Sequence, residues 1–235
     1  MTKTSEQGYA GKRILEAMRS AVRYGEAVFQ ELRRAAPQSG STILDFGAGD
    51  GFFLEKFHSQ GVAVDAVEPD PALQVALRPF TGRLWSDIRD VPGDSFDFVY
   101  TVNVLEHISE LDETCTQLSR VLKPNKELFV FVPAHEILWT SLDDEVEHVR
   151  RFDRHTLRAA LERAGFHIEH LRYFDFLGFP AALGVRMLEQ INLFKYGGSS
   201  LGFYDRNIFP ISQQMDRIFK GAMGKNLVAI ARRVG

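Results

Sequence analysis

Apolar and polar residues follow two different rhythms along this chain. Through residues 9–36, apolar side chains recur at helical spacing and charged residues fill the opposite face, which predicts one or two amphipathic helices. Further on, short apolar runs typical of buried strands alternate with stretches of helical spacing. We predict strands at 42–46, 63–67, 83–85, 95–100, 127–132, 166–174 and 225–233. We predict helices between them at 52–60, 69–77, 111–122 and 153–165. This alternation favours a doubly wound α/β domain.

The same pattern suggests a domain organisation. Residues 1–40 are predicted to form an N-terminal helical cap that ends at the turn-forming residues 37–40, and residues 41–235 to form the α/β domain. Between the last two strands, at about 177–224, we predict a helical lid with a joint at residues 197–200. The lid has apolar residues near helical spacing, namely Leu183, Met187, Ile191 and Phe194. This apolar face is expected either to pack on the sheet or to form a pocket or a membrane-surface contact for a hydrophobic acceptor.

The most informative short segment is residues 43–51, with the sequence ILDFGAGDG. It predicts a buried strand that breaks into a glycine-rich turn and opens a helix. Glu68 follows about twenty positions later, at the end of the next strand, as an acid does in nucleotide-cofactor sites. A dinucleotide fingerprint would need a third glycine at position 52 or 54, but Phe52 and Leu54 stand there. The alternative is a tight turn that binds no ligand.

The alternating Asp45-x-Gly47-x-Gly49-x-Gly51 pattern resembles motif I of the class I S-adenosylmethionine (SAM)-dependent methyltransferases. Four later segments are similar to that family in the same order, namely 86–99, 103–108, 121–128 and 225–233. The resemblance implies a Rossmann-like, doubly wound, seven-stranded sheet whose last strand is antiparallel. It also implies SAM as the cofactor and methyl transfer as the reaction.

The resemblance and the chemistry of SAM together imply a set of cofactor contacts. Asp45 is expected to receive the ammonium group, Glu68 the ribose diol and Asp87 the adenine amine. The complete predicted set is Asp45, Gly47, Ala48, Gly49, Glu68, Pro69, Asp87, Ile88 and Asn103. Alternative interpretations are a solvated loop acid for Asp87 and a simple strand-end turn for Asn103.

The acceptor side is expected in the segment 133–151, after the fifth strand. Residues 147–152 (EHVRRF) resemble a segment found in a methyltransferase subgroup associated with glycans, lipids and natural products. We assign His148 as the candidate catalytic base. The predicted substrate-binding residues are His135, Trp139, Arg150, Arg151 and Tyr173. The alternative is that His148 and the two arginines only pin this loop to the sheet.

Composition narrows the remaining choices. A net charge of −3 over 235 residues predicts no dominant nucleic-acid-binding field. A single cysteine, Cys115, excludes a disulfide framework or zinc cluster and favours a cytoplasmic protein. No signal peptide and no bilayer-spanning stretch are predicted, although peripheral lipid contact remains open. The acids and histidines near His148 lack a matching second ligand set, so no metal is predicted.

We therefore interpret the chain as a methyltransferase for a small, partly hydrophobic acceptor, acting by in-line transfer. Alternatives are a protein or RNA methyltransferase and a non-catalytic SAM-binding scaffold. The edge after the fourth strand lacks the NPPY or DPPY sequence of many macromolecule methyltransferases. The oligomeric state is left open.

Overall fold

The structure is a computed structural model that describes residues 19–37, 40–191, 193 and 198–235. The chain divides into two compact units. We call residues 29–132, 154–171 and 228–235 the sheet unit, and residues 1–28, 133–153 and 172–227 the helical unit. Part of the predicted helical stretch at 9–36, namely residues 9–18, lies outside the described residues, as do Phe194 and the first residue of the predicted joint at 197–200.

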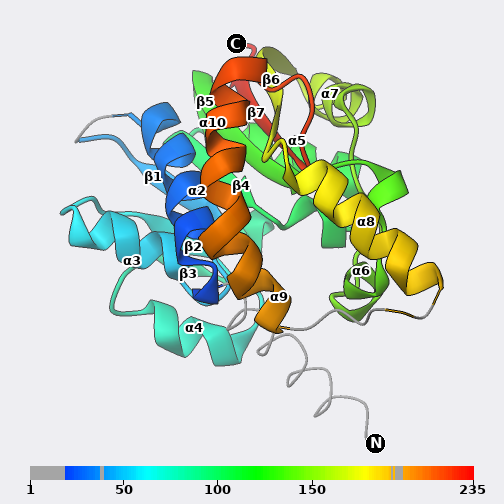
Figure 1. Ribbon diagram of the computed structural model, residues 1–235. Coiled ribbons are helices and arrows are strands. Elements are labelled where there is room, and N and C mark those ends of the chain that lie inside the picture. The colour runs from blue at the N-terminus through cyan, green and yellow to red at the C-terminus, as the bar shows by residue number, and fades with distance from the viewer. Residues whose placement is uncertain (1–18, 38–39, 192, 194–197) are drawn as a thin grey trace, which may run out of the picture. The chain divides into compact units, whose positions relative to one another are not determined.

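Seven strands form one sheet within the described part of the chain (Figure 1). They are β1 (Ile43–Phe46), β2 (Asp65–Val67), β3 (Leu84–Trp85), β4 (Phe96–Val102), β5 (Leu122–Pro133), β6 (Phe166–Phe174) and β7 (Asn226–Arg233). Their order is β3-β2-β1-β4-β5-β7-β6, the first five pair in parallel, and the last strand is antiparallel. The predicted fold class is therefore confirmed. The order in which strands are added to the sheet reverses between β1 and β4, and open α/β sheets bind ligands at such a switch point.

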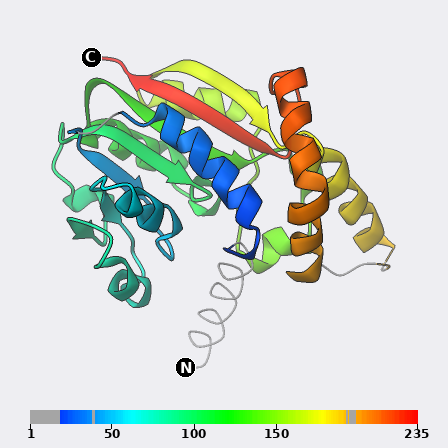
Figure 2. The same cartoon turned by 60° about the vertical axis from the view of Figure 1, so that its left-hand side comes forward.

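Helices of the sheet unit cover the strands on both faces. They are α2 (Val22–Ala35), which begins in the helical unit, α3 (Phe52–Ser59), α4 (Pro71–Leu77), α5 (Leu111–Val121) and α7 (Arg154–Arg163), with the short turns η1 (Ile88–Asp90) and η2 (Leu105–His107). Phe29 of α2 and Tyr100 of β4 both contact the ring of Phe57 in α3, at 5.2 and 5.6 Å between ring centroids. Figure 2 shows α3 in front of the sheet and α7 behind it. These aromatic contacts fix the helix that follows the glycine turn.

The strand β5 is longer than predicted, because it begins at Leu122 directly after α5 rather than at Glu127. Leu122 pairs with Phe96, and Glu127 pairs with Phe98, so residues 123–126 bulge out of the ladder. Asn125 has a φ of 62°, which Asn tolerates better than most residues. Lys123 and Lys126 at the two ends of this bulge form ion pairs with Asp97.

The helical unit contains the segments added to the sheet. They are η3 (Glu136–Leu138), α6 (Ser141–Glu145), α8 (Gly178–Gln190), α9 (Gly198–Phe203), the π-helical turn η4 (Tyr204–Ile208) and α10 (Phe209–Phe219). Figure 1 shows α9, η4 and α10 running end to end as one helical rod. Pro210 has no N–H and cannot donate the helical hydrogen bond to the carbonyl of Arg206. The Arg23 guanidinium donates to that carbonyl instead, at 3.4 Å. Among the described residues, no helix is both long enough and apolar enough to cross a bilayer.

Candidate functional site

The glycine-rich turn folds back onto the end of β2. The N–H groups of Gly47 and Ala48 both donate to the carbonyl of Val67, at 2.9 and 3.2 Å. Gly47 has a φ of 81°, and a Cβ there would overlap the side chain of Val104. Gly51 has a φ of 82° and caps α3. The turn therefore requires glycine at these two positions for backbone conformation and for close packing.

Glu68 fastens this turn to the start of α4. Its Oε2 accepts from the N–H of Gly49 at 2.8 Å, and its Oε1 accepts from the N–H of Asp70 at 2.9 Å. The side chain is buried, and burial raises the pKa of the Glu68 carboxyl despite these two bonds. A carboxylate is thus fixed at the edge of the sheet by backbone donors alone.

Asp45 is the second buried acid of the turn region. It lies beside Tyr100 in the β1–β4 ladder and accepts a hydrogen bond of 2.9 Å from the Tyr100 hydroxyl. Burial raises the pKa of Asp45 to about 8, although the bond from Tyr100 opposes this. Among the described residues, neither Asp45 nor Glu68 forms an ion pair with a basic side chain. Two buried acids without a cationic partner are suited to a ligand that brings positive charge.

The other predicted cofactor residues surround the same end of the strands. Asp87 caps η1 and pairs with the guanidinium of Arg89, which lowers the pKa of Asp87. The side chain of Ile88 is buried, whereas Pro69 is exposed. Asn103 ends β4 with a φ of 54° and donates its N–H to Phe131 at 2.8 Å. The Asp87–Arg89 pair is exposed, so it can open at little energetic cost.

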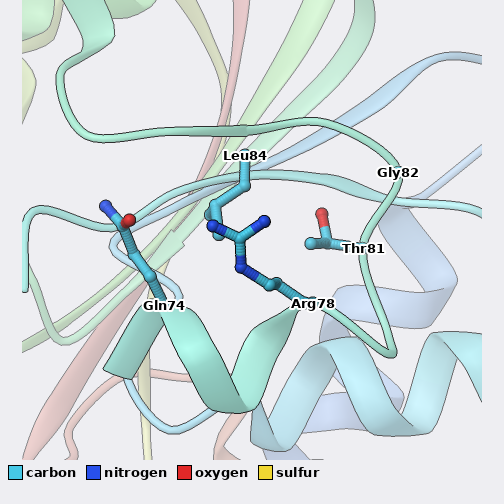
Figure 3. A pocket seen from close by; sticks show the side chains of 5 residues that line it. All are labelled: Gln74, Arg78, Thr81, Gly82 and Leu84. Atoms are coloured by element: carbon cyan, nitrogen blue, oxygen red, sulfur yellow. The ribbon is translucent and has the colours of Figure 1, made fainter. Parts of the chain in front are cut away.

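A surface hollow of about 230 Å³ lies between α4 and β3 (Figure 3). Figure 3 shows the guanidinium of Arg78 beside Leu84 within it. Its five lining residues are Gln74, Arg78, Thr81, Gly82 and Leu84, none of which belongs to the predicted cofactor set. Gln74 links this hollow to the predicted cofactor residues, because its side-chain amide donates to the carbonyl of Glu68 at 2.6 Å.

In the helical unit, Asp143 is the centre of the loop that carries His148. Its buried carboxylate accepts from His148 Nδ1 at 2.7 Å, and from Arg151 Nε and Nη2 at 2.8 and 2.9 Å. It also accepts from the N–H and hydroxyl of Thr140. The bond from the Thr140 N–H and the reciprocal bond from the Asp143 N–H to the Thr140 side chain form the capping box of α6. Burial alone would raise the pKa of Asp143, but the bonds from His148 and Arg151 lower it to about 2.

This arrangement assigns different tasks to His148 and Arg151. A neutral His148 that donates from Nδ1 to Asp143 carries its lone pair on Nε2, the nitrogen that accepts a proton. Arg151 binds Asp143 with two of its nitrogens and donates from Nη1 to the Ala134 carbonyl at 3.2 Å, so its guanidinium holds the loop. Arg150, the adjacent residue, is partly buried.

The remaining predicted acceptor residues form aromatic contacts in the helical unit. His135 stacks on Tyr173 with 4.6 Å between ring centroids, and the ring of Phe179 meets His135 edge-on at 5.0 Å. Trp139 lies 6.5 Å from His148 between ring centroids and donates to Asp144 at 2.9 Å. Trp139 and His148 are thus neighbours, as are His135 and Tyr173.

The sequence reasoning missed a second buried network in the helical unit. Asp175 accepts hydrogen bonds from Tyr204 and Ser212, and it forms an ion pair with Lys225 at 3.3 Å. The ammonium of Lys225 lies over the rings of Tyr24 and Tyr204, at 4.6 and 4.9 Å. These residues come from four distant segments, so sequence spacing carried no signal for the network. It also missed Tyr100, which the expected pairing of the first and fourth strands places opposite Asp45.

A family model described as a methyltransferase domain matches residues 18–171. The chain belongs to this family. An uncharacterized methyltransferase of Mycobacterium tuberculosis strain H37Rv is 38% identical over 95 residues, and one of Mycobacterium leprae strain TN is 34% identical over 96 residues. The matched stretch covers 37% of each chain in the first case, and 38% of this chain and 36% of the relative in the second. The match thus spans just over a third of these relatives.

Solved structures share the fold of this methyltransferase. The methyltransferase in complex with the Trm112 activator of Haloferax volcanii has a TM-score of 0.67 at 15% identity, over all of both chains. A SAM-dependent methyltransferase of Archaeoglobus fulgidus has a TM-score of 0.59 at 21% identity, over 89% of this chain and 94% of that one. Haemonchus contortus phosphoethanolamine N-methyltransferase 2, in complex with SAM, has a TM-score of 0.57 at 18% identity, over 87% and 51%. The chain therefore carries a methyltransferase domain with the fold of SAM-dependent methyltransferases, as predicted.

Proposed function

We propose that this enzyme methylates a small, partly hydrophobic acceptor. The observation that carries the cofactor half of the proposal is the pair of buried acids, Asp45 and Glu68, held by Tyr100 and by backbone N–H groups without a basic partner. SAM, when bound, supplies a positively charged sulfonium whose methyl group is open to attack. Both acids stabilise positive charge, and a carboxylate fixed as Glu68 is can also accept hydrogen bonds from a ribose diol.

We assign the cofactor contacts by the geometry of the sheet edge. The Asp45 carboxylate holds the ammonium group, and the backbone of Gly47, Ala48 and Gly49 lines the methionine and ribose portions. Glu68 holds the ribose with Pro69 beside it. Asp87 turns from Arg89 to the adenine amine while Ile88 packs on the ring. Asn103 presents its carbonyl near the ammonium.

On the acceptor side, His148 is the proposed base. Asp143 orients its ring and stabilises the imidazolium that forms when Nε2 takes a proton from the acceptor. Arg150 is the proposed partner for an acceptor carboxylate or phosphate, and Arg151 is a positioning residue. The aromatic surfaces of Trp139, His135 and Tyr173 support an acceptor with an apolar part.

A macromolecular acceptor is the second candidate. The Haloferax volcanii relative by fold is bound to a methyltransferase activator, so an activator partner and a protein or RNA acceptor are the corresponding expectations for this chain. Against it stand the net charge of −3 and the missing NPPY-type edge. The two candidates share the cofactor site and differ in the acceptor.

Calorimetry with SAM and with its demethylated product tests the cofactor assignment. Glu68→Ala should weaken SAM binding at least about tenfold, because charge-assisted hydrogen bonds contribute roughly 1.5–3 kcal/mol each. Glu113→Ala removes an exposed carboxylate from α5 and should leave the affinity unchanged. Equal affinity of wild type and folded Glu68→Ala would refute the role of Glu68.

Formation of the demethylated product, measured over a panel of small phenols, carboxylates and amines, tests the acceptor. Bulk tRNA and a cell protein extract form the second arm, assayed with and without a Trm112-type activator. Turnover on the small-molecule panel supports the proposal. Turnover confined to the macromolecular arm overturns it and leaves the cofactor assignment intact.

A further inference from the structure

The helical rod formed by α9, η4 and α10 has its polarity reversed relative to an ordinary surface helix. Its inward side carries the buried residues Asp205, Phe209 and Ser212, and Asp216 is partly buried. The Asp205 carboxylate accepts the N–H groups of Arg23 and Tyr24, at 3.1 and 2.7 Å. Three of these four inward residues are therefore polar and hold the rod by hydrogen bonds, beside the packing of Phe209 against the rings of Tyr24 and Phe174.

The outward side of the rod carries large apolar residues. Phe203, Ile211 and Ile218 are 63%, 54% and 68% exposed. They are separated by eight and seven residues, about two helical turns each, so they form one stripe along the rod. The outward side of a surface helix is usually polar. A continuous row of exposed apolar residues is typical of an interaction surface.

The charges beside this stripe are all positive. Arg206, Arg217 and Lys220 are exposed, and the two arginines lie eleven residues, or about three turns, apart on one flank. The acids of the rod are engaged elsewhere, because Asp205 caps α2 and Asp216 accepts the N–H groups of Asp175 and Phe176 at 3.0 and 2.9 Å. The outward face therefore combines apolar side chains with cations and presents no carboxylate.

We propose that this face docks onto an anionic lipid surface, with the rod lying in the plane of the interface. Such a surface offers both an apolar layer for Phe203, Ile211 and Ile218 and negative headgroups for the cations. A second copy of the chain would match the apolar stripe, but it would bring the same cations into contact with one another. The charge pattern therefore favours lipid over self-association.

Flotation of the full chain with vesicles tests this surface. We expect binding to vesicles of phosphatidylcholine with phosphatidylglycerol, and little binding to phosphatidylcholine alone. Ile211→Glu and Ile218→Glu should each lower binding roughly tenfold, because each removes an aliphatic side chain that the lipid would bury and adds a charge that the anionic headgroups repel. The matched control is Val75→Glu, which changes a residue that is 69% exposed on α4 and should bind as wild type does.

Variants that remove single positive charges measure the electrostatic contribution to lipid binding. Arg206→Gln and Arg217→Gln should each lower binding roughly fivefold, whereas Arg78→Gln, which changes the exposed residue directly after α4, should not. SAM calorimetry on the same samples verifies that each variant is folded, and its result does not depend on lipid. Failure of wild type to bind anionic vesicles, or equal binding of Ile211→Glu and wild type, overturns the proposal. A wild-type dimer in light scattering that Ile211→Glu converts to a monomer also overturns it, in favour of a second copy.

Discussion

Buried carboxylates occur in both units of this enzyme, and the pair Asp45 and Glu68 has surroundings opposite to those of the pair Asp143 and Asp175. In the sheet unit, Asp45 and Glu68 receive hydrogen bonds from a tyrosine and from backbone N–H groups, and burial raises the pKa of both. In the helical unit, the Asp143 carboxylate accepts hydrogen bonds from His148 and from the guanidinium of Arg151, and these bonds lower its pKa to about 2. Asp175 similarly has Lys225.

This difference distinguishes buried acids suited to binding a ligand from buried acids that stabilise the fold. A buried acid with cationic partners is satisfied within the protein, and removing it leaves those partners unsatisfied. A buried acid without them is costly to ionise, and a cationic ligand lowers that cost. Asp45 and Glu68 are therefore suited to a cationic ligand, as the proposed SAM site requires, whereas Asp143 holds its loop and contacts His148.

The largest expected effect comes from the proposed base. His148→Ala should lower kcat by about 10²–10⁴ with a small-molecule acceptor, because general-base catalysis contributes that much. SAM affinity should stay unchanged, since all proposed SAM contacts lie in the sheet unit. His155→Ala, which changes an exposed histidine of α7, is the control. Full turnover in His148→Ala would reduce the residue to a structural role.

Replacing Asp143, the carboxylate that holds the loop carrying His148, should lower the stability of the folded protein. Asp143→Ala should lower the free energy of unfolding by about 3–5 kcal/mol, because it leaves the buried end of Arg151 without its carboxylate. Asp144→Ala, on the same helix, removes only an exposed acceptor of Trp139 and should cost less than about 1 kcal/mol. Denaturant titration of both variants measures the difference, and equal losses would contradict the distinction.

The stabilising effect of Asp143 also has a defined pH dependence. The folded pKa of about 2 lies below the ordinary 3.8, so its contribution is complete above about pH 4. It should be lost as the pH falls from 4 to 2, and Asp143→Ala should lack that part of the acid transition.

Replacing the buried acid Asp45 of the sheet unit should instead raise the stability of the SAM-free protein at high pH. The folded pKa of Asp45, about 8, lies above its ordinary 3.8, so its ionisation lowers the stability of the SAM-free protein as the pH rises from 4 to 8. Asp45→Asn keeps an acceptor for Tyr100 and should raise the melting temperature at pH 8 by a few degrees. SAM affinity should fall about tenfold. A lower melting temperature at pH 8 would place Asp45 with Asp143 as a structural acid.

The smallest effect is expected at the exposed pair of Asp87 and Arg89. Asp87→Ala should weaken SAM binding only a few-fold, because one exposed hydrogen bond contributes about 0.5–1.5 kcal/mol. Arg89→Ala should leave the affinity equal or slightly higher, since it releases Asp87 for the adenine amine. Calorimetry that ranks Arg89→Ala below Asp87→Ala would instead assign the guanidinium to the ligand.

The sequence predicted most of the fold because its signals are local. The glycine turn, the Asp70 cap and the apolar runs each act within a few residues, and the strand at Phe166–Phe174 matched the prediction. The start of β5 was misplaced, because Pro124 and Asn125 indicate a turn, whereas the structure accommodates them in a bulge after Leu122. The network around Asp175 joins residues that are distant in the sequence, so spacing could not predict it. The partners of Asp143 lie within eight positions of it, but their spacing does not show that they converge on one buried carboxylate.

The bulge at residues 123–126 also has a practical consequence. It lies at the amino end of β5, whereas the proposed SAM contacts follow the carboxyl ends of the parallel strands. Pro124, Asn125 and Lys126 are exposed and stand outside the ladder of the sheet. A fluorophore or short epitope attached at Asn125 would therefore project from this bulge, away from the edge of the sheet where the SAM contacts are proposed. Such a label could report on this methyltransferase in a crowded extract while leaving its chemistry undisturbed.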